Sequence, residues 1–315
     1  MDYSAPQDMC YHSLIWASMF FTFSLASSIL NQLIESSLFF EFPLILILFQ
    51  GGLTLTVLET LKYFKLLRFS SFTLSISTRL ILPAAAISVV NYITVVLVDN
   101  PNYLYIDKVK CFGATTTVCF FLLVTRRTIS LWYTTMAFIS SVTIYYGLSF
   151  DDSPSDSSFW IGGILIFLQI SSHLMISQTL RWVQSPEFLY IQSLFTVIIL
   201  FGVELFKHDV KMMSTYLFIW RFPYFFPVFG SLLFCNIIAH YAFLKTLQYT
   251  DIFTVAMISN MRAACQFIIF YYIYRYVSMQ KTWEKYSTIS VCLSVLSTII
   301  STIFCIGYIR RQAFM

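Results

Sequence analysis

Charged residues are scarce in this chain of 315 residues. Asp, Glu, Lys and Arg together make up 11% of it and hydrophobic residues 58%, whereas a soluble domain typically carries about 25% charged residues. The composition therefore excludes an ordinary soluble domain. The net charge of +4 is small and dispersed along the chain, so we expect no nucleic acid among its partners.

Motifs of enzymes and metal sites are missing as well. The seven cysteines include no CxxC pair, and the sequence has no HExxH helix and no Ser/His arrangement at a plausible spacing. We therefore predict no catalytic residue, no metal and no cofactor. The first residues, MDYSAPQDMCYHS, lack the basic region and the cleavage site of a removable signal peptide.

Long apolar runs are what the sequence does contain. A helix needs about 20 mostly apolar residues to span a bilayer, and only such a regular element satisfies its own backbone polar groups over these runs in lipid. We predict an all-α integral membrane protein, with one transmembrane domain over residues 1–315 and about ten spans. The predicted spans are 12–30, 42–61, 79–98, 103–124, 131–150, 159–180, 188–206, 222–244, 250–274 and 286–308.

The distribution of Lys and Arg predicts the orientation of the spans. With a cytoplasmic N-terminus, ten basic residues lie in the cytoplasmic connections and six on the opposite side, where the acidic DDSPSD loop also lies. Both termini are therefore expected in the cytoplasm. The inverse orientation stays open, because the difference between the two sides is small.

A faint repeat links the two halves of the chain. Residues 91–110 and 240–262 each contain a polar residue followed by tyrosine, then a short polar break, then basic residues within the next span. The polar-aromatic pairs are Asn91-Tyr92 and His240-Tyr241. The pattern predicts inverted pseudo-repeats of five helices, about 12–150 and 159–308, with a substrate site at their interface. Chance similarity between apolar segments is the alternative.

Ionisable residues inside a span mark cavities or partners, because charge is costly in lipid. Asp107 and Lys110 are three residues apart and share a helix face, so they can pair. Lys108 lies on another side of the helix and would be an unpaired cation that faces a polar interior. A later start of this helix, near Val109, would instead leave all three charges in a loop. Arg262 has mostly apolar residues on both sides. A cavity that holds Lys108 and Arg262 would suit a phosphate or pyrophosphate, which arginine binds through two parallel hydrogen bonds.

Six segments along the chain match one known family: SSILNQLI, FEFPLILILFQ, LRFSSF, PNYLYIDKVK, FLYIQSLF and TVAMISNMRAA. On these segments, which extend from Ser27 to about Tyr308, the chain resembles the nucleotide-sugar transporters of the drug/metabolite transporter superfamily. The nearer subgroup carries UDP-glucuronate and UDP-N-acetylgalactosamine, with the GDP-mannose transporters as cousins.

The resemblance implies an antiporter that works by alternating access. It would exchange a nucleotide sugar, with a UDP-sugar favoured, for a nucleoside monophosphate across the Golgi or endoplasmic reticulum membrane. The protein would act within the lipid bilayer. Whether it assembles into a homodimer stays an open question. Arg262 and Ser259 match the family's phosphate contacts, and Tyr190 and Gln192 match positions that recognise the nucleotide. Together with the pairs of the repeat, the residues expected to bind substrate are Lys108, Arg262, Tyr190, Gln192, Ser259, Asn260, Asn91, Tyr92, His240 and Tyr241.

Six positions depart from the family's pattern, and two of them are Gln192 in place of an asparagine and Ser259 in place of a glycine. Gln32 stands where the family usually has lysine, and Asp107 stands where a basic residue is expected. Ile191 replaces an aromatic residue, and Ala263 replaces an asparagine. These departures keep a second hypothesis open, a transporter-like protein without transport activity that acts as a binding or trafficking partner. A carrier of another phosphorylated organic anion is the third.

Overall fold

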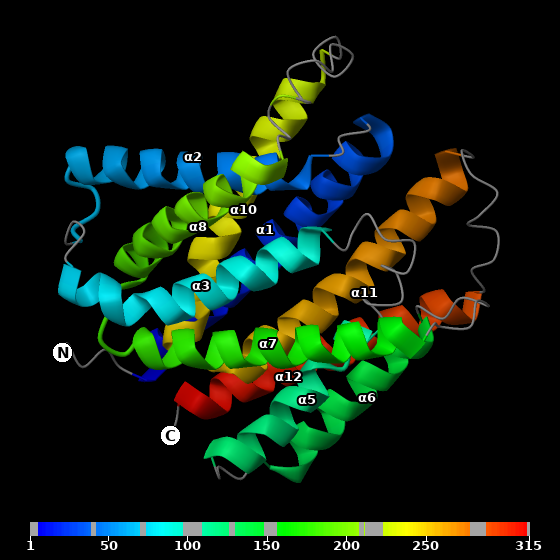
Figure 1. Ribbon diagram of the computed structural model, residues 1–315. Helices are drawn as coiled ribbons and strands as arrows, with labels where there is room; N and C mark the ends of the chain where they lie inside the picture. The colour runs from blue at the N-terminus through cyan, green and yellow to red at the C-terminus, as the bar shows by residue number, and fades with distance from the viewer. Residues whose placement is uncertain are drawn as a thin grey trace. The chain divides into compact units, whose positions relative to one another are not determined.

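The computed structural model describes residues 6–38, 42–69, 74–96, 109–125, 130–147, 156–207, 211, 223–277 and 288–313. Within these ranges the chain forms helices joined by short turns and contains no strand (Figure 1). The elements are α1 (Pro6–Leu38), α2 (Pro43–Tyr63), α3 (Leu74–Val96), α5 (Gly113–Phe120), the π-helical turn η2 (Phe121–Thr125), α6 (Leu131–Gly147), α7 (Asp156–Thr179), α8 (Ser185–Lys207), α10 (Phe225–Tyr249), α11 (Ile252–Val277) and α12 (Thr288–Ala313).

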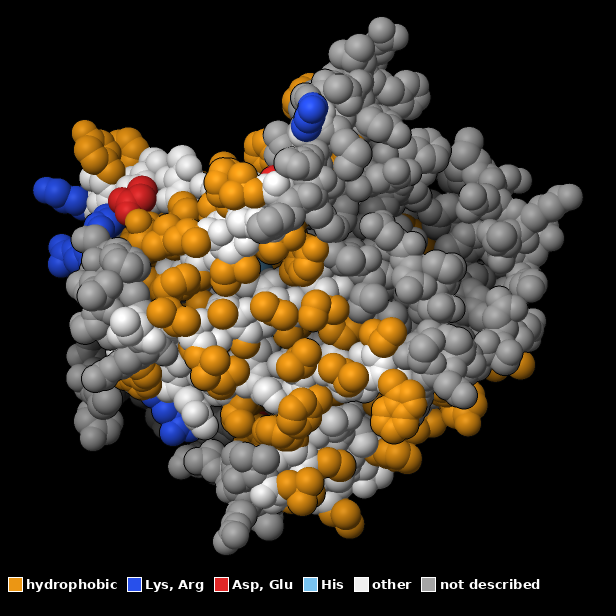
Figure 2. All heavy atoms as spheres, in the orientation of Figure 1, with side chains coloured by type: hydrophobic (Ala, Val, Ile, Leu, Met, Phe, Trp, Pro, Cys, Tyr) orange, Lys and Arg blue, Asp and Glu red, His pale blue; other side chains and the backbone are white. Residues whose placement is uncertain are grey.

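Long apolar helices dominate the fold. In the described residues, 7 helices are long and apolar enough to cross a membrane. They are Cys10–Ile34, Leu44–Tyr63, Trp160–Thr179, Ser185–Leu205, Phe225–Tyr249, Ile252–Phe270 and Ile289–Gln312. The described residues are therefore all-α and consistent with a multi-pass membrane protein, as predicted. Large apolar side chains cover much of the face shown in Figure 2, where a bilayer would contact them.

The prediction of ten spans stays a prediction. Two of the remaining segments contain only shorter apolar helices in the described residues, Leu80–Ile93 and Gly113–Leu123, and α6 has 17 residues. The span expected over 103–124 is described only from Val109 onward. There the Phe112 N–H donates to the Val109 carbonyl at 3.0 Å in a tight turn, and α5 begins at Gly113.

Several helices begin at residues whose chemistry suits a helix start. Proline occupies the first turn of α2, at Pro43, and of α8, at Pro186, where its missing N–H has no intrahelical partner to lose. Asp251 caps α11, because its Oδ1 accepts hydrogen bonds from the N–H groups of Phe253 at 3.1 Å and Thr254 at 3.4 Å. Pro83 lies inside α3 and is buried, so that helix lacks one of its backbone hydrogen bonds.

The helices pack into two compact units, each described by itself. One consists of Met1–Phe21, Pro101–Ile170 and Tyr249–Met315, and the other of Thr22–Asn100 and Ser171–Gln248. In the first unit α12 packs against α6 and α11, and α11 also packs against α5. In the second unit α8 packs against α2 and α3.

Small hydroxyl residues join α6 to α12 in the first unit. The buried Ser140 Oγ lies 3.1 Å from Ser297 Oγ and 2.8 Å from Ser301 Oγ. About two turns further along α6, Gly147 leaves no room for a side chain, because an added Cβ would lie 2.9 Å from Ser294 Oγ and 3.2 Å from the Ser290 carbonyl oxygen. We call this contact the hydroxyl seam. It follows the rule that small residues let membrane helices approach closely.

Asp251 also ties the start of α11 to the end of α12. Its Oδ2 accepts hydrogen bonds from the Tyr308 hydroxyl at 2.6 Å and from Gln312 Nε2 at 2.7 Å. Burial raises the pKa of the Asp251 carboxyl, and these hydrogen bonds oppose the shift. Because this pKa is raised in the folded state, the Asp251 carboxyl stabilises the fold fully when the pH is below the ordinary carboxyl pKa of about 4. This contribution to the free energy of unfolding is lost as the pH rises through the raised pKa.

We therefore expect the unfolding temperature of the wild type, relative to that of the Asp251→Asn variant, to fall as the pH rises from about 4. Asparagine keeps the helix cap but does not titrate. The measurement is thermal unfolding of both proteins in one detergent over a range of pH. Other titrating groups cancel in the comparison, so a difference that does not change with pH would contradict the expectation.

Candidate functional site

Arg262 lies near the middle of α11, in the first unit. Its Nε is buried and has no hydrogen-bond partner among the described residues. Ser259 lies three residues before it and therefore on the same helix face, and both side chains are partly exposed. The Ser259 hydroxyl donates to the Val255 carbonyl at 3.0 Å, which leaves the lone pairs of its oxygen able to accept. The structure thus brings these two predicted residues together.

Asn260 points to a different side of α11. It is 2% exposed, and its Nδ2 donates to the Ser141 hydroxyl of α6 at 3.5 Å. The Thr115 hydroxyl of α5 donates to the same Ser141 oxygen at 2.9 Å. These bonds connect three helices in the interior of the unit. They give Asn260 a packing role, and its contact with substrate stays a prediction.

Tyr190 and Gln192 belong to the second unit and lie on different faces of α8, because two residues along a helix turn by about 200°. The Tyr190 ring lies 5.6 Å from the ring of Phe69, and its hydroxyl hydrogen-bonds to Glu59 near the end of α2. Gln192 is buried, and its Oε1 has no hydrogen-bond partner among the described residues. The structure therefore separates these two residues, which the resemblance placed in one nucleotide site.

His240 lies in a polar layer of the second unit. Its Nδ1 is 3.3 Å from Gln50 Nε2 of α2, and one turn earlier in α10 Asn236 accepts a hydrogen bond from Ser27 of α1. The His173 ring of α7 is tilted against the Phe243 ring, with 4.9 Å between the ring centroids. Polar side chains from α1, α2 and α10 thus meet within one unit, which is costly in a membrane unless the groups satisfy one another.

The other predicted residues are distributed as follows. Asn91 is partly exposed on α3, and Tyr92 packs on the apolar cluster of Leu44, Ile47 and Leu200. The Tyr241 ring has the Lys245 ammonium 5.9 Å from its centroid. Lys108 lies outside the described residues, as does Asp107 and hence the predicted pair of Asp107 with Lys110. No group of three His, Cys, Asp or Glu that could hold a metal is found in the described part.

The sequence alone did not indicate some of the polar residues that the structure shows in the interior. The contact between Gln50 and His240 could not be predicted, because the two residues are far apart along the chain. Glu204 lies near the end of α8 and is 7% exposed. Serine at spacings of three and four residues along α12, by contrast, is a signal that could have indicated the hydroxyl seam.

Comparison with known proteins gives the fold and no family. No family model matches the chain, and no curated protein matches it. One solved structure, described only as "Crystal structure of protein", is similar over 96% of this chain and 99% of that chain, with a TM-score of 0.64 and 10% sequence identity. At that identity the likeness concerns the fold alone. A solved protein therefore shares the fold of this chain over nearly its whole length.

Proposed function

We propose that the chain is a membrane antiporter of nucleotide sugars, with UDP-sugars as the favoured substrates and a nucleoside monophosphate as the counter-substrate. It would act in the Golgi or endoplasmic reticulum membrane with both termini in the cytoplasm. Arg262 would bind phosphate, with Ser259 beside it. Lys108 would supply a second cation from the other half of the chain.

The observation that carries the proposal is the state of the Arg262 side chain. A guanidinium is charged at all relevant pH values, and in an apolar helix its buried donors are unfavourable unless an acceptor meets them. Its Nε lacks an acceptor among the described residues. A phosphate group is an acceptor of suitable charge and geometry, because a guanidinium can donate two parallel hydrogen bonds to it. Arg262 therefore has the properties of a ligand-binding residue.

The packing of equivalent helices supports the predicted repeat on which the antiporter hypothesis depends. In the alignment of the two halves, the second span corresponds to the seventh, the fourth to the ninth and the fifth to the tenth. Three contacts within the units join such pairs: α2 with α8, α5 with α11, and α6 with α12. Equivalent elements that pack on each other are expected near a pseudo-two-fold axis.

Exchange in proteoliposomes tests the proposal. The purified full-length chain is reconstituted, the vesicles are loaded with UMP, and the uptake of labelled UDP-sugars is measured over time. We expect uptake that requires UMP inside the vesicles, as antiport demands. GDP-sugars with internal GMP form the parallel series. If neither series gives uptake above that of protein-free vesicles, the chain is not a nucleotide-sugar antiporter.

A further inference from the structure

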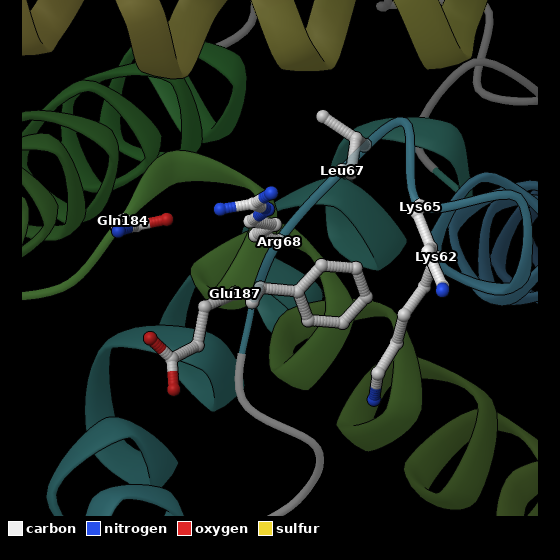
Figure 3. Close-up of a pocket in the computed structure, with 7 residues that line it drawn as sticks. Lys62, Lys65, Leu67, Arg68, Gln184 and Glu187 are labelled. Atoms are coloured by element: carbon white, nitrogen blue, oxygen red, sulfur yellow. The ribbon is translucent and has the colours of Figure 1, made fainter.

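A cavity of about 590 Å³ lies in the second unit, where α2 ends and α8 begins (Figure 3). Three basic side chains line it, Lys62 from α2 and Lys65 and Arg68 from the connection that follows. Gln184 and Glu187 line it from the start of α8, with Phe69 beside them. We call this cavity the basic pocket. Its volume is in the range of about 300–1,000 Å³ that holds small organic ligands, so it exceeds the needs of a single inorganic ion.

The backbone at Lys65 is an exception to a common rule. The Leu66 N–H donates to the Leu61 carbonyl at 2.9 Å and the Lys65 N–H to the Lys62 carbonyl at 2.9 Å, which is the helix-ending pattern that usually contains glycine. Lys65 has a φ of 58°, in the left-handed region. A lysine here strains the backbone slightly, where glycine would not. Replacing Lys65 by glycine would therefore remove the side chain and relieve the backbone at the same position.

Large apolar side chains are exposed beside the basic pocket. Tyr63 is 82% exposed and Leu66 71% exposed, next to the pocket's lysines, and Trp182 on the turn before α8 is 55% exposed. Aromatic residues of membrane proteins concentrate at the boundary between hydrocarbon and headgroups. Lys and Arg side chains also gather at the edge of the face in Figure 2 where Figure 1 draws the end of α2. These features favour a position of the pocket at headgroup level.

We propose that the basic pocket binds the phosphate group of an anionic phospholipid headgroup. The orientation predicted from the sequence places it on the cytoplasmic side, whose leaflet carries the anionic lipids, and basic pockets between helices on that side suit such headgroups. The lipid chains would lie against the exposed Tyr63, Leu66 and Trp182. A soluble phosphate would interact with the same basic side chains, but it would not contact this apolar surface.

The one acid in the lining does not reverse its charge. Among the residues that line the pocket, Lys62, Lys65 and Arg68 outnumber the one acid, Glu187. In Figure 3 the Glu187 carboxylate points away from the ammonium groups of Lys62 and Lys65. The Lys62 Nζ lies 5.0 Å from the Phe69 ring centroid, which restrains its position through a cation–π contact. The pocket is therefore a positively charged cavity with one of its cations held in place.

A binding titration on the purified full-length protein in a neutral detergent tests the proposal. The probes are dioctanoyl phosphatidylinositol 4-phosphate, the zwitterionic dioctanoyl phosphatidylcholine, and inorganic phosphate. We compare the wild type with Lys65→Gln/Arg68→Gln and with a control, Arg310→Gln/Arg311→Gln, which removes the same charge from exposed positions of α12 outside the pocket. We expect the anionic lipid to bind the wild type and the control alike, and the pocket variant at least about tenfold more weakly, because charge-assisted hydrogen bonds are lost.

A single variant separates binding from folding. Lys65→Gly relieves the left-handed backbone, so its unfolding temperature without lipid should equal or exceed that of the wild type, while its affinity for the anionic lipid falls. If inorganic phosphate binds the wild type as tightly as the lipid does, and the pocket variant loses both, the pocket binds phosphate from a soluble source. Equal affinity of the pocket variant and the wild type for the lipid, or an equal loss in the control, would overturn the proposal.

Discussion

We expect Arg262→Ala to abolish the proposed exchange of UDP-sugars for UMP without lowering the stability of the protein. The two effects have one cause. The buried Nε has no acceptor among the described residues, so removing the guanidinium removes an unfavourable buried donor from the empty protein. The substrate, in contrast, loses its charged partner, which is worth about 3 kcal/mol or roughly a 100-fold loss of affinity. Initial uptake rates and thermal unfolding measure the two effects.

Two further variants make the Arg262 result specific. Arg262→Lys keeps the positive charge but lacks the two parallel donors of arginine, so exchange should fall between the wild type and Arg262→Ala. Arg310→Ala removes an exposed arginine from the last turn of α12 and should leave exchange unchanged. If Arg262→Ala still exchanges substrate but unfolds several degrees earlier, the arginine is structural and the proposed site is wrong.

We expect Gly147→Leu to lower the free energy of unfolding by roughly 3 kcal/mol, at the upper end of the usual effect of overpacking. Even a Cβ at this position would lie 3.2 Å from the Ser290 carbonyl oxygen. Because that oxygen belongs to the backbone of α12, the helix must shift to make room. A shift would also lengthen the 2.8 Å contact between Ser140 and Ser301 further along the hydroxyl seam. Thermal unfolding in detergent, compared with the wild type, measures the loss.

Gly163→Leu on α7 is the matched control for Gly147→Leu. An added Cβ at Gly163 has no heavy atom within 4 Å in the described part of the structure, and the residue is exposed. The same substitution there should change the unfolding temperature little. If the two variants lose stability equally, the loss comes from placing leucine in a helix and not from the seam.

The sequence predicts the helices well, because the length and continuity of an apolar run decide whether a segment can cross a membrane. The span predicted over 188–206, for example, lies within α8, which extends over Ser185–Lys207. The predicted spans in the middle of the first half are harder, because residues such as Asn100, Pro101 and Asp107 interrupt their apolar character. Residues 97–108 lie outside the described ranges, so the predicted ends of the spans over 79–98 and 103–124 stay predictions.

The candidate site is less predictable, because it depends on partners distant in the sequence. Ser259 and Arg262 could be placed on one face from helix geometry alone, and the structure agrees. Asn260 could not be assigned, since nothing in the sequence indicates that Ser141 lies opposite its amide. The Asp251 cap was readable in principle, as an aspartate directly before an apolar run. Its further bonds to Tyr308 and Gln312 were not, because they depend on how α11 and α12 pack.

The hydroxyl seam also has a consequence for how the first unit opens. Ser140 shares its hydroxyl with two serines of α12, and all three are buried. Separating α6 from α12 breaks both contacts at once and leaves their hydroxyls without partners in lipid, while moving both helices together breaks neither. We therefore expect α6 and α12 to open together. In a hydrogen-exchange experiment their backbone amides would become accessible to solvent in the same opening event.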